Sequence, residues 1–167
     1  MLRAPEALRE SHRRASFHSG KPSLDDWFRR HALQAQQAGS ARTFVVCDDE
    51  IDGTVVGYFS LTVGQVEAVD APARVGKGMG RHPIPVMLLA RLAVSSSHQG
   101  RGIGRGLLQD AIRRSLLVAE QAGIRALLTH PLDDAATRFY LRFGFQTSPL
   151  DDRQLLLLLK DARKLIR

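Results

Sequence analysis

The stretch Gln99-Gly100-Arg101-Gly102-Ile103-Gly104 follows an apolar run at 86–94 and precedes a helical pattern that starts near Leu107. A glycine-rich turn between a strand and a helix points backbone N–H groups at a ligand, and the helix dipole favours negative charge there. Glycine has no Cβ, so a diphosphate can approach the backbone closely. Arg101 and Arg105 can add charge-assisted hydrogen bonds. The stretch therefore predicts a site for a pyrophosphate group.

Two other phosphate-binding motifs do not fit this turn. A P-loop needs Lys followed by Ser or Thr after its last glycine, and Arg105-Gly106 stands there instead. A dinucleotide fingerprint needs Gly-x-Gly-x-x-Gly, a spacing that glycines 100, 102, 104 and 106 do not contain. The remaining pattern is Gln-x-x-Gly-x-Gly, formed by Gln99, Gly102 and Gly104.

The elements around the turn alternate between strand and helix patterns. Apolar residues at helical spacing predict helices at 24–38, 107–122 and 135–143, with Ser23 capping the first and Asp133 or Asp134 the third. Apolar and β-branched runs predict strands at 43–47, 54–63, 86–94, 126–130, 145–147 and 155–159, the first two antiparallel. Residues 64–85 lose periodicity, and 74–83 are interpreted as a mobile basic loop. We expect one domain, 1–167, of the α/β or α+β class with a mixed sheet.

The composition is that of a globular protein with a strong positive charge. Lys and Arg number 24 against 17 Asp and Glu, a net charge of +7, and only four of the cations are lysines. This balance favours an anionic partner, either nucleic acid or a phosphorylated cofactor, although a GC-rich genome also explains the Arg-to-Lys ratio. The single cysteine, Cys47, excludes an internal disulfide and a multi-cysteine metal site. The single cysteine fits a reducing compartment, and we expect a cytoplasmic protein. The longest apolar run, 155–159, is too short to cross a membrane.

Two motifs together resemble the GNAT superfamily of acyl-CoA-dependent N-acetyltransferases. The first is Gln99-x-x-Gly102-x-Gly104 after the strand sequence LARLAV, and the second is Ala135-x-x-Arg138-Phe139-Tyr140-x-x-Phe143-Gly144-Phe145. Their order and spacing match the superfamily. The resemblance implies a GNAT fold, with a single mixed, mostly antiparallel sheet flanked by helices. It also implies acetyl-CoA as the acyl donor, without a metal.

A narrower resemblance to the TacT-type GNAT toxins covers nearly the whole chain. It rests on residues 17–27, 41–46, 83–86, 92–94 and 143–151. The resemblance implies acetylation of the α-amino group of aminoacyl-tRNA, which blocks translation. It implies neutralisation by a ribbon-helix-helix antitoxin, and homodimers are common among these toxins.

The same resemblance assigns roles to individual residues. Backbone groups of Leu92, Ala93 and Val94 would bind the pantetheine arm, and an amide of Leu92 or Val94 would polarise the thioester carbonyl. The cofactor-binding turn would comprise Gln99, Gly100, Arg101, Gly102, Ile103, Gly104 and Arg105. Tyr140 matches the tyrosine that protonates the departing thiolate, and its ordinary pKa of about 10 keeps it protonated at neutral pH. The alternative for Tyr140 is a core position.

A general base is missing from the strand at 86–94, where the one charged residue is Arg91. A lysine acceptor, with a pKa near 10.4, would be almost wholly charged at pH 7, whereas the pKa of an α-amino group starts near 7.7–8.0, about two and a half units lower. The missing carboxylate therefore favours an aminoacyl-ester acceptor. His130 or a water chain remains an alternative base, and a structural role at a strand end is the simpler interpretation of His130. Tyr58 and Cys47 lie in strand patterns and are expected to be buried.

Six basic side chains are candidates for tRNA binding: Arg29, Arg30, Arg74, Lys77, Arg81 and His82. Each is equally compatible with a solvated surface position. Few aromatic residues are interleaved with them, so recognition of backbone and shape is expected rather than base stacking. The main alternative function is an acetyltransferase for a small-molecule amine or a protein amine. A CoA-binding module without turnover and a nucleic-acid repressor are less compatible with Tyr140 and with the helix patterns.

Overall fold

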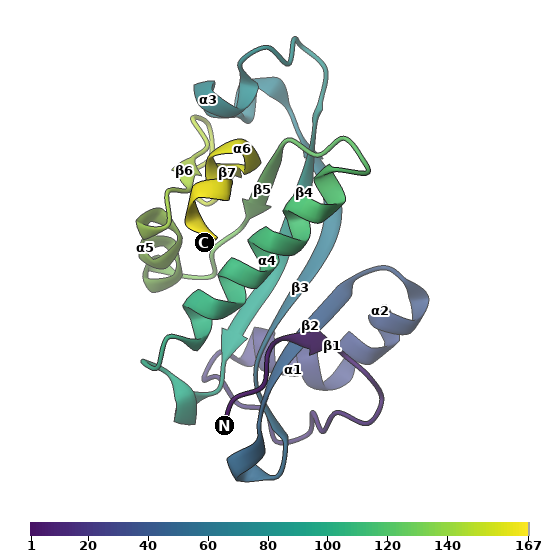
Figure 1. Cartoon of the computed structure of the whole chain (residues 1–167). Helices are drawn as coiled ribbons and strands as arrows, with labels where there is room; N and C mark the ends of the chain where they lie inside the picture. Colours follow the sequence, from purple (N-terminus) through teal and green to yellow (C-terminus); the bar gives the residue numbers. More distant parts are fainter. Residues whose placement is uncertain (167) are drawn as a thin grey trace. The chain divides into compact units, whose positions relative to one another are not determined.

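The computed structural model describes residues 1–166 and contains a seven-stranded sheet with the strand order β1-β2-β3-β4-β5-β7-β6 (Figure 1). The strands are β1 (Glu6–Ala7), β2 (Arg42–Asp48), β3 (Thr54–Val66), β4 (Ile84–Val94), β5 (Ala126–Thr129), β6 (Gln146–Thr147) and β7 (Leu155–Leu158). The α-helices are α1 (Pro22–Arg30), α2 (Ala32–Ala38), α3 (Ala73–Gly76), α4 (Ile103–Ala119), α5 (Asp134–Arg142) and α6 (Leu159–Ala162). Strands β4 and β5 are parallel, and the pairs β1–β2, β2–β3, β5–β7 and β6–β7 are antiparallel. The mixed, mostly antiparallel sheet is thereby confirmed.

The chain divides into two compact units, through both of which β3 and β4 run. The first comprises Met1–Thr62 and Ala90–Ala111, and the second Val63–Leu89 and Ile112–Arg167. The single domain expected from the sequence stays a prediction.

The core of the first unit is aromatic. Phe28 of α1, Ala32 of α2, Val45 of β2 and Tyr58 of β3 are all fully buried in one cluster. The rings of Phe28 and Tyr58 are stacked with centroids 4.4 Å apart, and the Tyr58 hydroxyl donates to the Leu24 carbonyl at 2.7 Å. Because the hydroxyl has a partner, Tyr58 can be buried at little cost, and its expected packing role is confirmed.

The core of the second unit is aliphatic. Every residue of β5 and of β7 is buried, so these strands are continuous apolar runs rather than alternating ones. The short helix α3 covers this region with Val75, which is fully buried. The guanidinium of Arg125 donates to the carbonyls of Val75 and Lys77 at 3.0 and 3.1 Å, which holds α3 in place.

The first predicted helix, 24–38, is wrong in its start and in its continuity. The helix α1 begins at Pro22 with Lys21 as its N-cap, so Ser23 is not the cap. Proline is well suited to a first helical position because its missing N–H is not needed there. The helix is interrupted at His31, and Phe28 and Ala32 on either side of the break pack into the same cluster, as an i, i+4 pair does. The end at Gly39, in the left-handed conformation with φ 76°, is as predicted.

The other boundaries differ by a few residues. Helix α4 begins at Ile103 instead of 107, because the Ile103 side chain is buried and the Gly106 N–H already donates to the Gly102 carbonyl. It ends at Ala119 instead of 122, where the Ala122 N–H still donates to the Val118 carbonyl within a turn. Helix α5 begins after Asp133, whose carboxylate accepts from the Ala136 N–H at 2.8 Å, so the first of the two predicted caps is the one used.

One short strand and two short α-helices were not predicted: β1, α3 and α6. Strand β1 lies in a polar segment and pairs with β2 through Glu6 and Ala7, a partner that local sequence does not reveal. Helix α3 lies within residues 64–85, where periodicity is lost, and overlaps the start of the loop interpreted at 74–83; the burial of Val75 stabilises it. Among residues 1–166, no helix has both the length and the apolar character that crossing a membrane requires.

Candidate active site

Strand β4 extends past its parallel neighbour. The β4–β5 ladder pairs Val86 with Ala126 and ends at Leu89 with Thr129, five residues before the end of β4 at Val94. Within the extension, Leu92 and Val94 are half-buried and Ala93 is 5% exposed. A strand segment past the end of a ladder offers backbone N–H and C=O groups to an extended ligand.

The glycine turn lies between β4 and α4 and has the backbone conformation that its sequence suggests. Gly100 and Gly102 have φ of 79° and 81°, in the left-handed region that favours glycine. Gly100, Arg101, Gly102 and Arg105 are exposed, whereas Ile103 is buried. The exposed backbone at the start of α4 can accept an anion.

Gly57, in the middle of β3, allows α4 to begin close to the sheet. A Cβ at Gly57 would lie 3.1 Å from Leu107 Cδ1 and 3.2 Å from Ile103 Cγ2. The β2–β3 register also shifts beside it, between Val46 and Cys47, which is typical of a β-bulge. Sequence analysis missed Gly57, although a glycine inside a strand pattern is a known sign of close backbone approach.

The residue just before the turn, His98, is buried and contacts a buried carboxylate, that of Asp48. His98 Nε2 and Asp48 Oδ2 are 2.9 Å apart, and His98 Nδ1 lies 2.8 Å from Ser97 Oγ. The hydrogen bond to His98 lowers the pKa of Asp48 below its usual value, with a further contribution from the Glu50 backbone N–H. Asp48 is the last residue of β2, so this contact ties the segment before the turn to the sheet. Neither residue was singled out from the sequence, because the two lie 50 positions apart.

Tyr140 belongs to the second unit and is held by a short hydrogen-bond chain. Its ring is 5% exposed on α5 and packs against Phe139 and Phe145 with centroids 5.1 and 5.2 Å apart. Thr129 Oγ1 donates to the Leu89 carbonyl at 3.0 Å and is also hydrogen-bonded to the Tyr140 hydroxyl. Burial raises the pKa of Tyr140 to about 12, partly opposed by Thr129. Tyr140 therefore stays protonated at every physiological pH.

The other titratable side chains considered from the sequence have structural contacts. His130 directly follows β5, is exposed, and has Nε2 3.2 Å from Gln154 Oε1. Cys47 is fully buried, and burial raises the pKa of its thiol, as expected for an unreactive cysteine.

The six basic candidates differ in whether their side chains are already engaged by other groups of the protein. Arg29 donates from Nε and Nη2 to the Phe17 carbonyl at 2.9 and 2.7 Å, so it supports the segment before α1. Arg74 forms a two-bond ion pair with Asp161 at 3.0 and 2.6 Å. The remaining four are exposed and form no ion pair within residues 1–166: Arg30, Lys77, Arg81 and His82.

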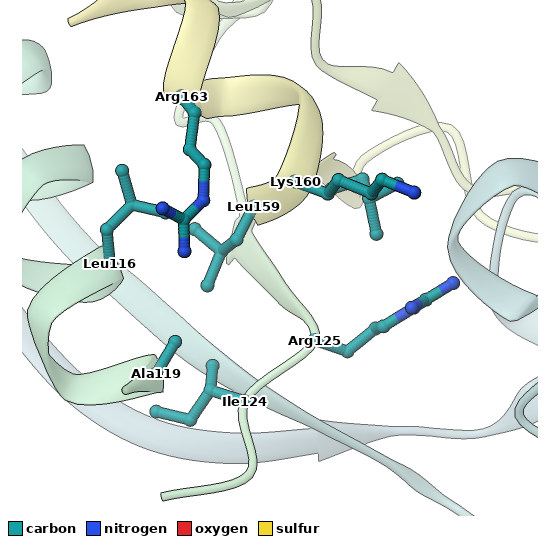
Figure 2. Close-up of a pocket in the computed structure, with 8 residues that line it drawn as sticks. Leu116, Ala119, Ile124, Arg125, Leu159, Lys160 and Arg163 are labelled. Atoms are coloured by element: carbon teal, nitrogen blue, oxygen red, sulfur yellow. The ribbon is translucent and has the colours of Figure 1, made fainter. Parts of the chain in front are cut away.

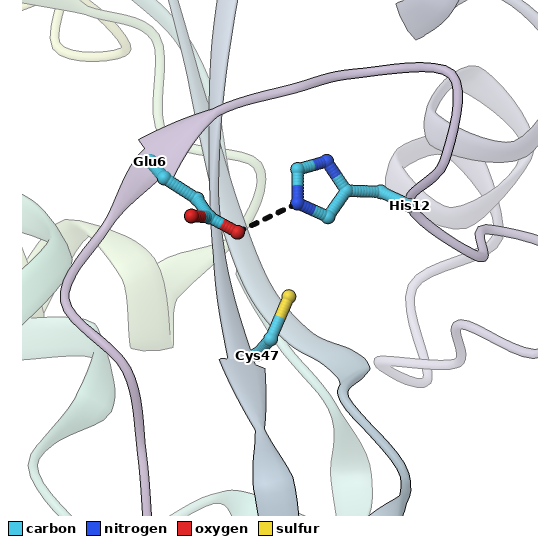
Figure 3. A group of neighbouring side chains, drawn as sticks. All are labelled: Glu6, His12 and Cys47. Carbon is cyan, nitrogen blue, oxygen red and sulfur yellow. Dashed lines mark hydrogen bonds and ion pairs between the residues drawn. The ribbon is translucent and has the colours of Figure 1, made fainter.

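A group of possible metal ligands that the sequence did not reveal lies beside β1. Donor atoms of Glu6, His12 and Cys47 all lie within 4.8 Å of one another (Figure 3). The Arg9 N–H donates to His12 Nδ1 at 2.9 Å, so the ring proton sits on Nε2 and is donated to Glu6 Oε1 at 2.7 Å. A cation on Nε2 would have to displace this proton and disturb the Arg9 contact. The group is best explained as a link between the N-terminal segment and β2.

A pocket of about 230 Å³ in the second unit contains none of the predicted site residues (Figure 2). Its apolar part comes from Leu116 and Ala119 of α4 and from Ile124, and Arg125, Lys160 and Arg163 surround it. It is a separate basic surface feature and not part of the glycine turn.

Comparison with known proteins agrees with the class that the fold and the turn define. Residues 40–147 match the family model described as an acetyltransferase (GNAT) domain, and the chain belongs to this family. The chain is 48% identical over 163 residues to the tRNA-acetylating toxin of Mycobacterium tuberculosis (strain ATCC 25618 / H37Rv), covering 98% of this chain and 96% of that protein.

Two solved structures share the fold. AtaT complexed with acetyl-methionyl-tRNAfMet superposes with a TM-score of 0.90 at 23% identity, covering all of both chains. A mutant of AtaT bound to the C-terminus of the antitoxin AtaR and acetyl-CoA superposes with a TM-score of 0.82 at 23% identity, covering 98% of this chain and 97% of that one.

Proposed function

We propose that this protein is an acetyl-CoA-dependent toxin that acetylates the α-amino group of aminoacyl-tRNA and thereby inhibits translation. The observation on which this rests is the 48% identity, over almost the entire chain, to a tRNA-acetylating toxin. The left-handed glycines of the turn and the end of β4 beyond the β5 ladder support acetyl-CoA binding there, and Tyr140 would be the acid.

Acetyl-CoA would bind to the extension of β4 and to the turn. The pantetheine amides would pair with backbone groups of Leu92, Ala93 and Val94 in the manner of an added strand. The pyrophosphate would accept hydrogen bonds from N–H groups between Gly100 and Arg105. An N–H of Leu92 or Val94 would donate to the thioester carbonyl and stabilise the negative charge that develops on its oxygen.

Acetyl transfer would proceed by direct attack. The neutral amine attacks the thioester carbonyl carbon, a C–N bond forms, and the C–S bond breaks with its electron pair on sulfur. The CoA thiolate takes the phenol proton of Tyr140, and the attacking nitrogen releases one proton to water, from which Tyr140 is reprotonated. The raised pKa of Tyr140 keeps its phenol protonated before each turnover.

The absence of a carboxylate on β4 fits an acceptor that needs little deprotonation. The charged side chain on that strand is Arg91, which lies over the ring of Trp27 at 4.1 Å and whose pKa is lowered by burial. A cation beside the strand does not favour a charged lysine acceptor. An α-amino group, with an ordinary pKa of about 7.7–8.0, already has a sizeable neutral fraction at physiological pH without a base.

The proposed partners follow from the substrate and from the relatives. Aminoacyl-tRNA is a cytoplasmic substrate, so we place the activity in the cytoplasm. A ribbon-helix-helix antitoxin would neutralise the enzyme, and acidic residues on it would complement the net charge of +7. A homodimer is part of the proposal because such toxins commonly form one.

The test is transfer of labelled acetyl groups from acetyl-CoA to bulk charged tRNA, with deacylated tRNA and free amines as controls. Label on charged tRNA alone supports the proposal. The alternative, an acetyltransferase for a small-molecule or protein amine, predicts label on the free amines and none on tRNA. That outcome would leave the acetyltransferase class intact and remove the toxin function.

A further inference from the structure

The residues just before the glycine turn are held by two carbonyl groups of an N-terminal segment. The Ser96 N–H and Oγ donate to the His18 carbonyl at 2.8 and 3.2 Å. The Gln99 amide nitrogen donates to the Ser19 carbonyl at 3.0 Å and to the Val94 carbonyl at 3.1 Å. The 94–99 connection is therefore fixed to residues 18 and 19 at Ser96 and at Gln99.

Gln99 has no N–H left for a phosphate group. A primary amide has two N–H donors, and both are used on carbonyls of the protein. The remaining polar atom, Oε1, is an acceptor, so it cannot form a hydrogen bond with an ionised phosphate oxygen. The chemistry of this side chain is thus that of a brace between Ser19 and the end of β4, although the motif suggests a ligand contact.

Ser19 is itself held by a buried carboxylate on α1. The Ser19 N–H lies 3.0 and 3.1 Å from the two carboxylate oxygens of Asp25, and Ser19 Oγ donates to Oδ1 at 2.6 Å. Asp25 is 2% exposed, and Ser19 is 5% exposed. Burying a carboxylate is costly unless hydrogen bonds compensate for it, so these bonds fix Ser19 firmly to the helix.

We propose that Asp25, Ser19 and Gln99 form a positioning relay that sets the glycine turn for the diphosphate of acetyl-CoA. Asp25 holds Ser19, the Ser19 carbonyl holds Gln99, and Gln99 holds the end of β4 at Val94. None of the three touches the donor; they fix the backbone that does. This inference rests on the proposed function, since it assumes that the turn binds acetyl-CoA.

The test compares three variants by calorimetric binding of acetyl-CoA and by steady-state kinetics. D25N keeps the shape of Asp25 but removes its charge, and Q99M keeps the length of Gln99 but removes both donors. Each is expected to raise the Kd and the KM for acetyl-CoA about tenfold, because D25N weakens charge-assisted bonds to Ser19 and Q99M removes two bonds to backbone carbonyls, with kcat at saturation within about threefold. D26N, on the next and exposed residue of the same helix, should stay within about twofold of the wild type.

The double variant separates a relay from independent contacts. If the residues act through one another, D25N with Q99M raises the Kd no more than about tenfold, as either change does alone. If Gln99 were a direct ligand, the effects would multiply to about a hundredfold, which would overturn the relay. An unchanged Kd in Q99M would also overturn it, and this variant decides the matter if D25N does not fold.

The binding measurement is independent of the acceptor. A wild-type protein that binds acetyl-CoA but does not modify tRNA would refute the proposed function and leave the relay under test. A wild-type protein that does not bind acetyl-CoA would refute both.

Discussion

At the scale of single residues, the proposed chemistry depends on the phenol of Tyr140. The two tyrosines of the chain have different partners: Tyr58 donates to a helix carbonyl in an aromatic core, whereas Tyr140 is hydrogen-bonded to Thr129 beside the end of β5. The pair offers a matched comparison of one functional and one structural hydroxyl.

Replacing Tyr140 with Phe is expected to lower kcat by about 10²–10⁴, the range typical of losing a general acid, with little change in the KM for acetyl-CoA. Tyr58→Phe is the control. It removes the hydrogen bond to Leu24 and should lower the free energy of unfolding by about 1 kcal/mol while kcat per folded molecule is unchanged. Initial rates and urea unfolding of both variants measure this. Equal kcat losses in the two would remove the special role of Tyr140.

The raised pKa of Tyr140 gives a dependence of stability on pH. The folded protein keeps the phenol proton up to about pH 12, whereas the unfolded chain loses it near pH 10. This contribution is complete below about pH 10 and is lost as the pH rises toward 12. Between pH 9 and pH 11, the unfolding free energy of the wild type should fall by about 1.4 kcal/mol more than that of Tyr140→Phe. Parallel losses in the two proteins would show that the phenol titrates normally.

At the scale of elements, the site depends on how closely α4 begins against β3. Gly57→Ala would place a Cβ within 3.1–3.2 Å of Leu107 and Ile103, so either α4 or the strand must shift. We expect a loss of about 1–3 kcal/mol in unfolding free energy, typical of overpacking, and a raised KM for acetyl-CoA. Gly123→Ala meets no atom within 4 Å and should alter neither quantity. Thermal unfolding and donor kinetics check both, and an unaffected Gly57→Ala protein would contradict the packing argument.

Most elements could be predicted from the sequence because their patterns are strong. The β-branched run at 43–47 needs no tertiary information to be identified as a strand. The leucine run at 155–159 is less specific: β7 ends at Leu158, and Leu159, expected in the strand, begins α6. Strand β1 and helix α3 could not be predicted in this way: Glu6 is held by its pairing with Val45, and α3 by the burial of Val75. The break at His31 leaves no signal in the 24–38 pattern, which contains neither glycine nor proline.

At the scale of the whole molecule, the positive charge should make tRNA acetylation sensitive to salt. Removing one cation that binds a phosphate reduces the slope of log kcat/KM against log salt by about 0.7–0.9. Arg81 is exposed and has no ion-pair partner within residues 1–166, so Arg81→Gln should lower the slope by about this amount. Arg74 is already neutralised by Asp161, and Arg74→Gln should change the slope less. The reverse order would show that tRNA displaces Asp161 from Arg74.

The candidate site could be predicted only as far as its motifs are local. The glycine turn and Tyr140 were identified because each lies in a short pattern with fixed spacing. The residues that hold them were not identified, because none of them belongs to a short sequence pattern. Asp25 acts only through its contact with Ser19, Thr129 through Tyr140, and Asp48 through His98. Gln99 shows the limit most clearly, since its motif suggests a ligand contact while its hydrogen bonds fit a brace.

The position of the acetyl group in the product tests the proposed function most directly. Charged tRNA incubated with the protein and acetyl-CoA would be digested with nuclease, and the terminal aminoacyl-adenosine analysed by mass spectrometry. One acetyl group is expected on the α-amino nitrogen of the aminoacyl moiety, formed at a rate at least about a hundredfold lower with Tyr140→Phe. An unmodified aminoacyl end, with acetyl groups on free amines or peptides instead, would refute the acetylation of aminoacyl-tRNA.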